Sequence, residues 1–376
     1  MIRIERAAGR AKTRDFIRFA SSVNRGERAW VDTARYQLET FLRNGDSFVR
    51  RCSVEPVAAV EGGRTLAQAV LITHPEFPLL QLGFFEALPH QDEAVDALLS
   101  RARELARERG FPRIVIGLNG HVAYGVGIQT EGFAEKASFD SLWNPPWYAD
   151  YLERRGLESR ELVSWASDTA SLARLFNGPS ARRLEGPDWS FRTMDFRRFR
   201  EECLLFGELC NRCLADTPLY FYREPESLYE LLRALRPFLR PRHLRFALFR
   251  GESVGFLFWH PDWNEVLPAG RPVSTAEAAL RFALLAKRIG RVKINAIGVA
   301  PEHQGGSAAY GLIRSAWKDF SREFARGETN FVWAENAKSM AINRAINQRV
   351  MRRWRVYFMD ADERASAGSA GERGSP

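Results

Sequence analysis

Residues 294–311 read Ile-Asn-Ala-Ile-Gly-Val-Ala-Pro-Glu-His-Gln-Gly-Gly-Ser-Ala-Ala-Tyr-Gly, and this stretch decides the fold. Its apolar start, residues 294–299, predicts a buried strand. After a turn of glycine and other small residues, apolar residues at helical spacing predict a helix; they are Leu312, Ile313, Ala316, Trp317 and Phe320. Small side chains let backbone N–H groups approach an anion, and a helix N-terminus adds roughly half a positive charge. The stretch therefore predicts a phosphate-binding loop at residues 304–309.

The loop matches neither common nucleotide signature, since it lacks the Lys-Ser/Thr pair of a Walker A loop and a Gly-x-Gly-x-x-Gly. It resembles motif A of the GNAT superfamily of N-acyltransferases, Gln/Arg-x-x-Gly-x-Gly/Ala, whose loop binds the pyrophosphate of coenzyme A. Gln304 and Ala309 match the first and last positions, and Ser307 stands at the central glycine. The resemblance implies that the pyrophosphate is held by Gln304, Gly305, Gly306, Ser307, Ala308 and Ala309.

Working outward, the chain runs twice through a similar order of elements: a strand, two helices, a hairpin, a strand, a helix and a strand. In the first half we expect strands at 2–5, 48–60, 64–73, 79–86 and 113–117, and helices at 13–22, 32–42, 94–106 and 145–155. In the second half we expect strands at 189–194, 244–249, 253–260, 294–299, 329–334 and 354–359, and helices at 197–214, 227–235, 276–288, 310–324 and 337–347.

A stretch rich in Gly, Pro and charge separates the halves. We therefore predict an α/β fold with mixed sheets, built from two tandem GNAT-like domains. Residues 1–178 form a degenerate domain, residues 179–360 form the domain with the acyl-CoA site, and residues 361–376 form a disordered tail.

Further passages resemble one bacterial group of tandem GNAT proteins whose substrate is uncharacterised. They are Leu118-Asn119-Gly120, Glu131-Gly132-Phe133, Trp143-Asn144-Pro145-Pro146-Trp147-Tyr148, Glu208-Leu209-Cys210-Asn211-Arg212, Leu235-Arg236-Pro237 and the segment His260 to Leu267. Each is weak alone, but their order and spacing span most of residues 1–360. In the first half, the position of the phosphate loop holds no glycine and carries Asp92 and Glu93, which would repel a pyrophosphate. We interpret that half as scaffold or as a wall of the substrate side.

The resemblance implies further contacts to the cofactor in the second half. Ile297 and Val299 lie where GNAT backbone groups bind the pantetheine arm, and Asn336 matches an Asn that often contacts the coenzyme. Asn336 could equally serve as a helix N-cap. Many GNATs place a Tyr seven residues after that Asn to protonate the leaving thiolate; here the position is Asn343, a poor acid.

Transfer to an amine also needs a group that accepts a proton. Candidates are His260 and Asp262, at the end of a predicted strand, and Glu208 and Glu335. Alternatively, His260-Pro261-Asp262 forms a turn that ends a strand and has no catalytic role. His303 is expected to pack against the loop. No spacing of His, Cys or carboxylate residues indicates a metal site, so we predict none.

The amino-acid composition limits which partners and which cellular compartment we expect. The net charge is +9, mostly from dispersed Arg residues, which favours anionic partners but argues against a DNA-binding surface. Four Cys residues are too few for a disulfide framework, and we expect Cys210 and Cys213 to be structural or incidental. No apolar run reaches the roughly 20 residues of a membrane span, and no secretory signal is evident. We expect a cytoplasmic protein.

The function predicted is direct transfer of an acyl group, most simply acetyl from acetyl-CoA, to a small-molecule amine through a tetrahedral intermediate, with backbone N–H groups polarising the thioester. Two alternatives stay open. One is a transferase that uses aminoacyl-tRNA or an acyl carrier protein. The other is a non-catalytic protein that keeps the fold as a binding module.

Overall fold

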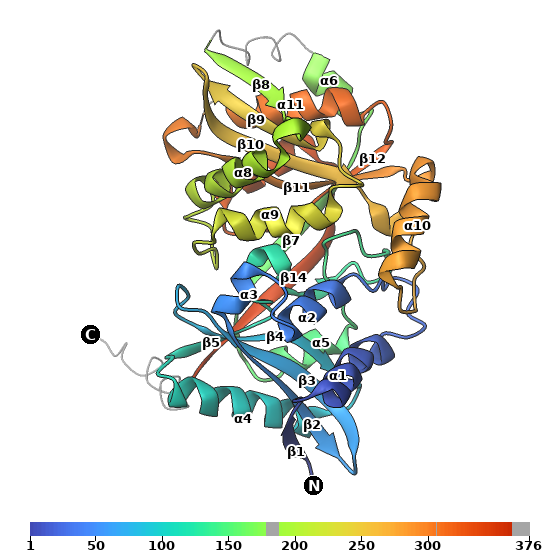
Figure 1. Cartoon of the computed structure of the whole chain (residues 1–376), viewed down its shortest axis with the longest axis vertical. Coiled ribbons are helices and arrows are strands. Elements are labelled where there is room, and N and C mark those ends of the chain that lie inside the picture. The colour runs from blue at the N-terminus through green and yellow to red at the C-terminus, as the bar shows by residue number, and fades with distance from the viewer. Residues whose placement is uncertain (178–187, 306, 363–376) are drawn as a thin grey trace, which may run out of the picture.

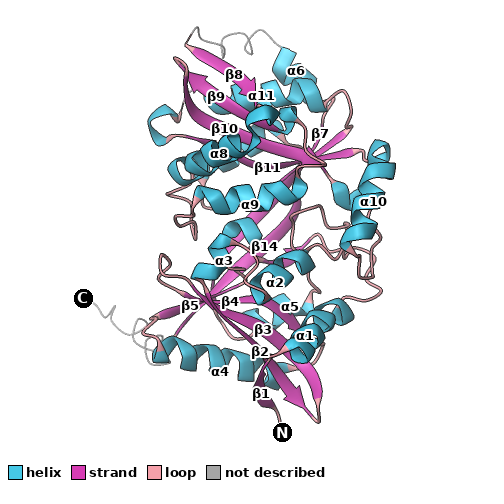
Figure 2. Cartoon of the chain, in the orientation of Figure 1, coloured by secondary structure: helices cyan, strands magenta, loops and turns pink. Residues whose placement is uncertain are grey.

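The computed structural model describes residues 1–177, 188–305 and 307–362, and it shows two α/β halves stacked along the long axis of the molecule (Figure 1). Each half places helices against a twisted sheet (Figure 2). The N-terminal half contains β1 (Arg3–Arg6), α1 (Arg10–Val23), α2 (Ala34–Leu42), α3 (Ser47–Arg51), β2 (Ser53–Glu61), β3 (Arg64–Thr73), β4 (Leu80–Ala87), α4 (Asp92–Glu108), β5 (Arg113–Ile116), β6 (Ile128–Glu131), α5 (Trp147–Glu153), β7 (Glu158–Asp168) and α6 (Leu172–Asn177).

The C-terminal half repeats this order. It contains β8 (Trp189–Thr193), α8 (Phe199–Cys213), α9 (Pro225–Leu235), β9 (Leu244–Phe249), β10 (Glu252–Pro261), α10 (Thr275–Leu285), β11 (Arg291–Val299), α11 (Ala308–Phe320), β12 (Arg326–Thr329), β13 (Val332–Trp333), α12 (Ala337–Ile346) and β14 (Arg349–Asp360). Short 3-10 turns link several of these elements.

One sheet runs through both halves, in the order β1-β2-β3-β4-β5-β14-β7-β12-β11-β10-β9-β8 among the described strands. The two halves exchange a strand. β14, the last strand of the chain, lies in the N-terminal half, with β5 and β6 along one edge and β7 along the other. β7 from the N-terminal half lies between β12 and β14 and also pairs with β13. The red strand in Figure 1 shows this crossing into the blue half.

β7 and β14 also pair with each other, antiparallel, from Arg349 opposite Ala166 to Phe358 opposite Glu158. The sheet therefore continues without a break from one half to the other. Residues 178–187, where we place the domain boundary, and residues 363–376 of the predicted tail lie outside the described residues. The division at 178/179 stays a prediction, and the exchanged strands mean that each half is completed by the other.

Local sequence explains several element boundaries. Asp46, Ser274 and Asn336 cap α3, α10 and α12, each accepting a backbone N–H bond, and Pro225 starts α9. One expectation is wrong: residues 48–51 form the end of α3 and not a strand, because Asp46 nucleates a helical turn there. β6 and β7 were not predicted.

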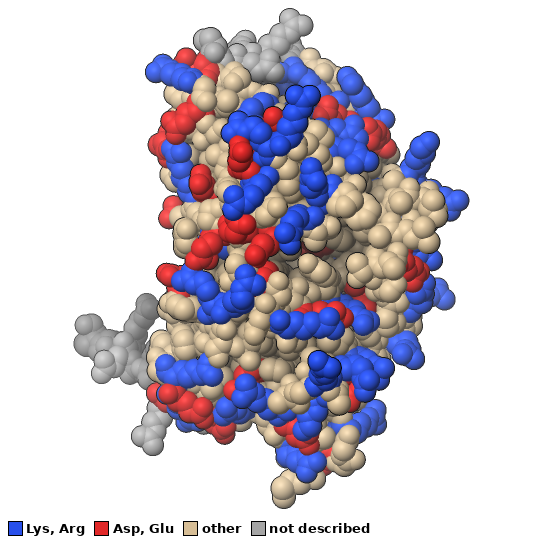
Figure 3. Space-filling model, viewed as in Figure 1, with Lys and Arg blue, Asp and Glu red and all other residues tan. Residues whose placement is uncertain are grey.

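Positive and negative side chains alternate over the face shown in Figure 3 and form no stripe of one sign there. Within the described part of the chain, no helix is long and apolar enough to cross a membrane.

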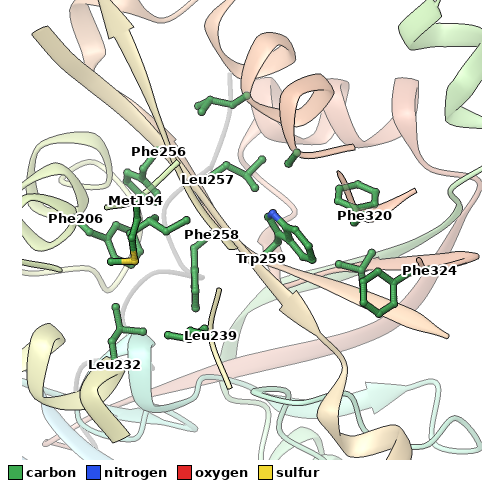
Figure 4. Packing of buried hydrophobic residues seen from close by; sticks show 14 of the residues in the cluster. Met194, Phe206, Leu232, Leu239, Phe256, Leu257, Phe258, Trp259, Phe320 and Phe324 are labelled. Carbon is green, nitrogen blue, oxygen red and sulfur yellow. The ribbon is translucent and has the colours of Figure 1, made fainter. Parts of the chain in front are cut away.

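The core of the C-terminal half is built around β10, whose residues alternate between two layers (Figure 4). Phe256 packs on Phe206 of α8 at 4.8 Å between ring centroids, whereas Trp259 packs on Phe320 of α11 at 5.6 Å. Both faces of the strand are buried because helices cover both faces of the sheet. This sandwich holds β11, the strand before the predicted loop, in a defined position.

Candidate functional site

β11 and β12 start side by side and then separate. They pair in parallel only at residues 291–294 and 326–329, after which the N–H of Asn330 bonds Ile294 O at 2.7 Å. The chain then leaves β11 to form β13 and pairs with β7. Among the described residues, no strand pairs with residues 295–299 on that side of β11. The result is a V-shaped opening beside a strand edge, and Ile297 and Val299 belong to that edge.

A β-bulge marks the point where the opening starts. Phe258 of β10 lies opposite Ala296, but its neighbour Trp259 lies opposite Ile294, so Asn295 is the extra residue. A bulge redirects the strand and its side chains at this point. Residues 294–297 are only half-buried, unlike the buried ends of the same strand.

The predicted phosphate loop lies at the far end of this edge. Gly305 has φ +81°, a backbone conformation that favours glycine, and a Cβ there would meet no atom within 4 Å, so there is open space above the loop. Gly306 lies outside the described residues. Ser307 has φ −82° and ψ −5°, an ordinary helical conformation that any residue adopts. Serine therefore replaces the motif's central glycine without backbone strain.

The start of α11 supplies donors to this space. The N–H of Gly311 makes a helical bond to Ser307 O at 2.8 Å, so the N–H groups of Ala308, Ala309 and Tyr310 have no partner four residues earlier within the helix. Among the residues that the structure describes, no side chain caps this end of the helix. Unpaired N–H groups at a helix N-terminus above an open loop are a suitable cradle for a phosphate.

A positive charge that the sequence analysis missed lies beside the loop. Lys338, in the first turn of α12, donates to Gln304 Oε1 at 3.2 Å, while Gln304 Nε2 donates to Val299 O at 3.1 Å. Asn336 acts as the N-cap of α12 and accepts from Ser339 N at 3.0 Å. A second helix N-terminus thus lies next to the loop.

Nearby groups support the loop. The acidic Glu302 is bonded by Arg212, and its own backbone N–H together with Arg212 holds the pKa of this carboxyl below its usual value. His303 packs edge-on against Trp189, with ring centroids 5.8 Å apart, and against Phe249. These contacts are those expected of a loop-packing residue.

A cavity of about 920 Å³ adjoins the opening on the side of the N-terminal half. The cavity is lined by Asn295 and Ala296 of β11 and by Asn330 and Phe331, which follow β12. The V-shaped opening between β11 and β12 therefore leads into the cavity. Other walls come from α8, α9 and α10 and from the N-terminal segments around α2, residues 121–125 and residues 139–142. The surface between the two halves is hollowed in Figure 3, between α2, α9 and α10. The cavity is therefore shared by both halves.

The N-terminal half has the same strand geometry but a filled opening. β4 and β5 pair in parallel at residues 80–82 and 114–116, and β4 has a register shift there. Asn119 then accepts a hydrogen bond from Phe84 N at 2.7 Å, and a Cβ on Gly83 would lie 2.6 Å from Leu118 O. The chain after β5 stays beside β4 and leaves no gap, which supports the interpretation of this half as degenerate.

The predicted proton acceptors fall in three different surroundings. Glu208 is exposed on α8, while its neighbours Gly207 and Cys210 face the cavity. Asp262 is fully buried and accepts from Phe139 N at 2.8 Å and Arg291 Nε at 2.7 Å. It joins the two halves and is not part of the cavity wall. We therefore leave Glu208 and Asp262 out of the proposal for proton transfer.

His260 is also fully buried, yet it reaches toward the cavity through a neighbour. Its ring stacks on Trp263 at 4.6 Å, and Nδ1 lies 2.9 Å from Pro261 O. Its Nε2 lies 3.4 Å from Oδ2 of Asp140, which lines the cavity. Sequence reasoning missed Asp140, because the contact joins residues far apart in the chain and no motif surrounds it.

The other predicted residues behave as follows. Glu335 is exposed and lies 3.4 Å from Arg160. Asn343 donates to Ser339 O at 2.9 Å within α12. Burial raises the pKa of both thiols of the Cys210-x-x-Cys213 pair, and all four cysteines are free. No group of three or more His, Cys, Asp or Glu side chains that could hold a metal was found in the part of the chain that the structure describes.

Solved structures share this architecture over nearly the whole chain. A tandem GNAT protein from the clavulanic acid biosynthesis pathway, solved without AcCoA, aligns with 96% of this chain and 99% of its own, at 14% identity and a TM-score of 0.52. A GCN5-related N-acetyltransferase from Sphaerobacter thermophilus aligns with 96% of each chain, at 13% identity and a TM-score of 0.52. A conserved protein of unknown function from Enterococcus faecalis V583, described as a probable N-acyltransferase, aligns over 96% of this chain and 73% of its own, at 8% identity and a TM-score of 0.53.

No family model and no curated protein matches the sequence. The structural matches confirm the predicted fold: an α/β protein of two tandem GNAT-like halves, which is the fold of N-acetyltransferases.

Proposed function

We propose that this protein transfers an acyl group, most simply acetyl, from acyl-CoA to an amine bound in the cavity between its halves. One observation carries the proposal. The open edge of β11 leads from the glycine-containing loop and the start of α11 at one end to the bulge and the cavity at the other. A cofactor with a pyrophosphate at one end, a peptide-like arm and a reactive thioester at the other end matches that line.

The residues of the C-terminal half divide the binding task. The N–H groups of Ala308 and Ala309, with Gly305 and the charge of Lys338, would hold the pyrophosphate. Gln304 keeps the loop against β11, and Ser307 starts the helix. Backbone groups of Ile297 and Val299 would pair with the pantetheine arm as a neighbouring strand would. The bulge at Asn295 would present a backbone N–H to the carbonyl oxygen.

The bound acyl-CoA supplies a thioester, whose carbonyl carbon an amine attacks and whose thiolate is a good leaving group. The chain therefore has mainly to position the amine and to accept its proton. Asn343 replaces the tyrosine that many GNATs use as an acid, but a thiolate is a weak enough base to leave without one. Burial of the reacting groups between the halves would exclude water.

Thermal unfolding with coenzyme A and acetyl-CoA tests the proposal. Both ligands should raise the melting temperature of the parent protein, since they bind only the folded state. Gly305→Asp should abolish the shift by placing a negative charge in the loop. Gly305→Asn is the matched control: it has almost the same shape, tolerates a positive φ and carries no charge, so it should keep most of the shift.

The other outcomes separate the alternatives. If neither ligand shifts the parent protein, acyl-CoA is not its substrate; a shift with aminoacyl-tRNA or an acylated carrier protein would then support the transferase of that kind. If coenzyme A binds but no amine panel releases free thiol from acetyl-CoA, the chain is a binding protein.

A further inference from the structure

We propose that the acceptor is an amine on a bulky, mainly apolar body, and that Asp140 of the N-terminal half receives its ammonium group and its proton. This inference rests on the proposed acyl transfer. It assigns the acceptor side of the reaction to the half that holds no coenzyme.

The cavity walls indicate the body of the acceptor. A volume of about 920 Å³ is far larger than an acetyl group or a small amine needs and is suited to a drug-sized molecule. Most of the wall away from the opening is aromatic or aliphatic; it includes Phe206, Leu232, Phe238, Phe258 and Phe282. Such a wall favours a ligand that gains free energy by burying apolar surface.

Three polar side chains of the cavity wall lie where the reaction would take place, while charged residues such as Arg35, Glu39, Arg223 and Glu277 lie elsewhere on the wall. Asn295 and Asn330 lie where β11 and β12 separate, and Asp140 faces them from the N-terminal half. Asn295, the bulge residue, donates from Nδ2 to Asp140 Oδ2 at 3.1 Å. The same residue therefore marks the position of the thioester and contacts the carboxylate. Oδ1 of Asp140 has no hydrogen bond among the described residues, which leaves it for a ligand.

Asp140 is held in an unusual conformation. Its φ is +62°, a left-handed region that costs non-glycine residues free energy and is enriched at functional sites. The residues on either side are fixed by buried contacts. Phe139 N bonds Asp262, and Lys293 Nζ donates to Ser138 Oγ at 2.9 Å and to Ser141 Oγ at 2.7 Å.

Behind this loop lies a buried ion cluster that makes it rigid. Glu328 is fully buried among Arg291, Lys293 and Arg352, and it accepts from Ser138 Oγ at 3.1 Å. Burial alone would raise the pKa of Glu328, but the three surrounding cations lower it, so the carboxylate stays charged. The N-terminal half therefore delivers Asp140 to the opening on a loop that the C-terminal half clamps.

His260 makes Asp140 a suitable proton acceptor. Pro261 O can only accept, so Nδ1 of His260 carries a hydrogen, and Nε2 of the neutral ring has a lone pair. The 3.4 Å contact between Nε2 and Asp140 Oδ2 becomes favourable when the pair takes up one proton. Lys293 of β11 lies opposite His260 in the pairing with β10, and its charge is opposed by Glu328 of β12 at 3.5 Å. His243 lies beside Trp259, next in sequence to His260.

The proposed step is balanced as follows. The ammonium group, R–NH₃⁺, gives one proton to the Asp140–His260 pair. The nitrogen lone pair forms the N–C bond, the C–S bond breaks with its electrons on sulfur, and a second nitrogen proton passes to the thiolate. The products are the amide and the free thiol, and the pair later releases its proton to water.

A long acyl chain is the rival occupant of the apolar walls. We favour the amine because the carboxylate of Asp140 and two asparagine side chains line the cavity at the opening, where an aliphatic chain would have to pass them. A cation bonds a carboxylate there, whereas a hydrocarbon would desolvate it without compensation.

Calorimetric titration of the protein saturated with coenzyme A tests the inference with 2-phenylethylamine, tryptamine, ethanolamine and 3-phenylpropionate. The two arylamines should bind, and ethanolamine and the carboxylate should bind much more weakly. Asp140→Asn suits the positive φ and removes only the charge, so it should weaken arylamine binding by about ten- to a hundredfold. Asp140→Gly, which also suits that backbone, repeats the test.

His260→Phe should keep the stacking on Trp263 and leave arylamine affinity within about threefold. With acetyl-CoA and 2-phenylethylamine it should shift the acidic limb of the pH–rate profile, which a purely structural role would not do. Equal arylamine affinity in the parent and Asp140→Asn, no binding of either arylamine, or octanoyl-CoA displacing the arylamine would overturn the inference. The coenzyme-induced thermal shift is measured separately, so its loss would refute the acyl-CoA proposal instead.

Discussion

Oδ1 of Asn119 accepts a hydrogen bond of 2.7 Å from the backbone N–H of Phe84, at the irregular turn of β4. The bond from Gly117 N to Leu82 O in the first half is equivalent to the bond from Asn330 N to Ile294 O in the second half. Phe84 lies two residues after Leu82 and Ala296 lies two residues after Ile294, so these two residues correspond. In one half this position is capped by a side chain, and in the other it lies at the open edge. The same strand geometry is thus closed in the N-terminal half, where the segment after β4 holds no glycine before α4, and open in the C-terminal half, where the loop after β11 contains Gly305.

Asn119→Ala should therefore reduce stability without affecting coenzyme binding. The side chain is 5% exposed, so its loss leaves the N–H of Phe84 buried without a partner, at a cost of about 1–3 kcal/mol. Urea unfolding measures the loss, and calorimetry with coenzyme A should still give one site per chain. A stoichiometry that rises to two would contradict the interpretation that the first half is a degenerate copy without a coenzyme site.

Lys338→Met should weaken coenzyme A binding several-fold, because the charge beside Gln304 is lost. The effect should shrink as salt rises, since the lysine is exposed and its field is screened. Lys318→Met is the matched control, with the same charge change in the last turn of α11. Pantetheine, which lacks phosphates, should bind both variants alike. Equal loss in both lysine variants would point to net charge and not to the loop.

Separate halves should fail to fold alone. A fragment of residues 1–178 lacks β14, which pairs with β5, β6 and β7, and a fragment of residues 179–376 lacks β7, which pairs with β12, β13 and β14. Each would expose long unpaired strand edges. Co-expressed with a tag on one, the fragments should purify together in equal amounts. Cooperative unfolding of either fragment alone would show that the exchanged strand is dispensable.

The free energy of unfolding should fall as pH rises from 6 to 8, because of Glu86. Burial raises the pKa of this carboxyl to about 8, although it accepts from Tyr148 Oη at 2.6 Å and Asn24 Nδ2 at 3.2 Å. The folded protein then holds a proton that the unfolded chain has released above its ordinary pKa of 4.5. Stability from a raised carboxyl pKa is present at low pH and lost as pH passes the folded value.

Glu86→Gln should flatten this slope between pH 6 and 8, measured by urea unfolding at several pH values. Burial also raises the pKa of Asp32 to about 6. The pH dependence of stability that Asp32 causes therefore falls mainly below pH 6, outside this window. An unchanged slope in the variant would assign the pH dependence to another group.

Much of the fold follows from local patterns in the sequence. The hairpin β9–β10, the strand β11 and the helices α4, α8 and α11 are where alternating or helical spacing of apolar residues places them. The loop at Gly305 is also local, because a glycine with positive φ followed by a helix start is a property of adjacent residues. The expected strand over residues 48–51 is wrong because the cap at Asp46 overrides the propensity of the apolar residues.

The sequence by itself therefore determined the α/β class, the repeated order and the candidate phosphate loop, since all three depend on contacts between near neighbours in the chain. Only the tertiary structure decided the exchange of β7 and β14, the closure of one opening by Asn119 and the meeting of Asp140 with His260 and Asn295 in the other. Those contacts join residues that are far apart in the chain, and they form because strands from different halves share one sheet. Position along the chain carries no record of which side chains that sheet brings together.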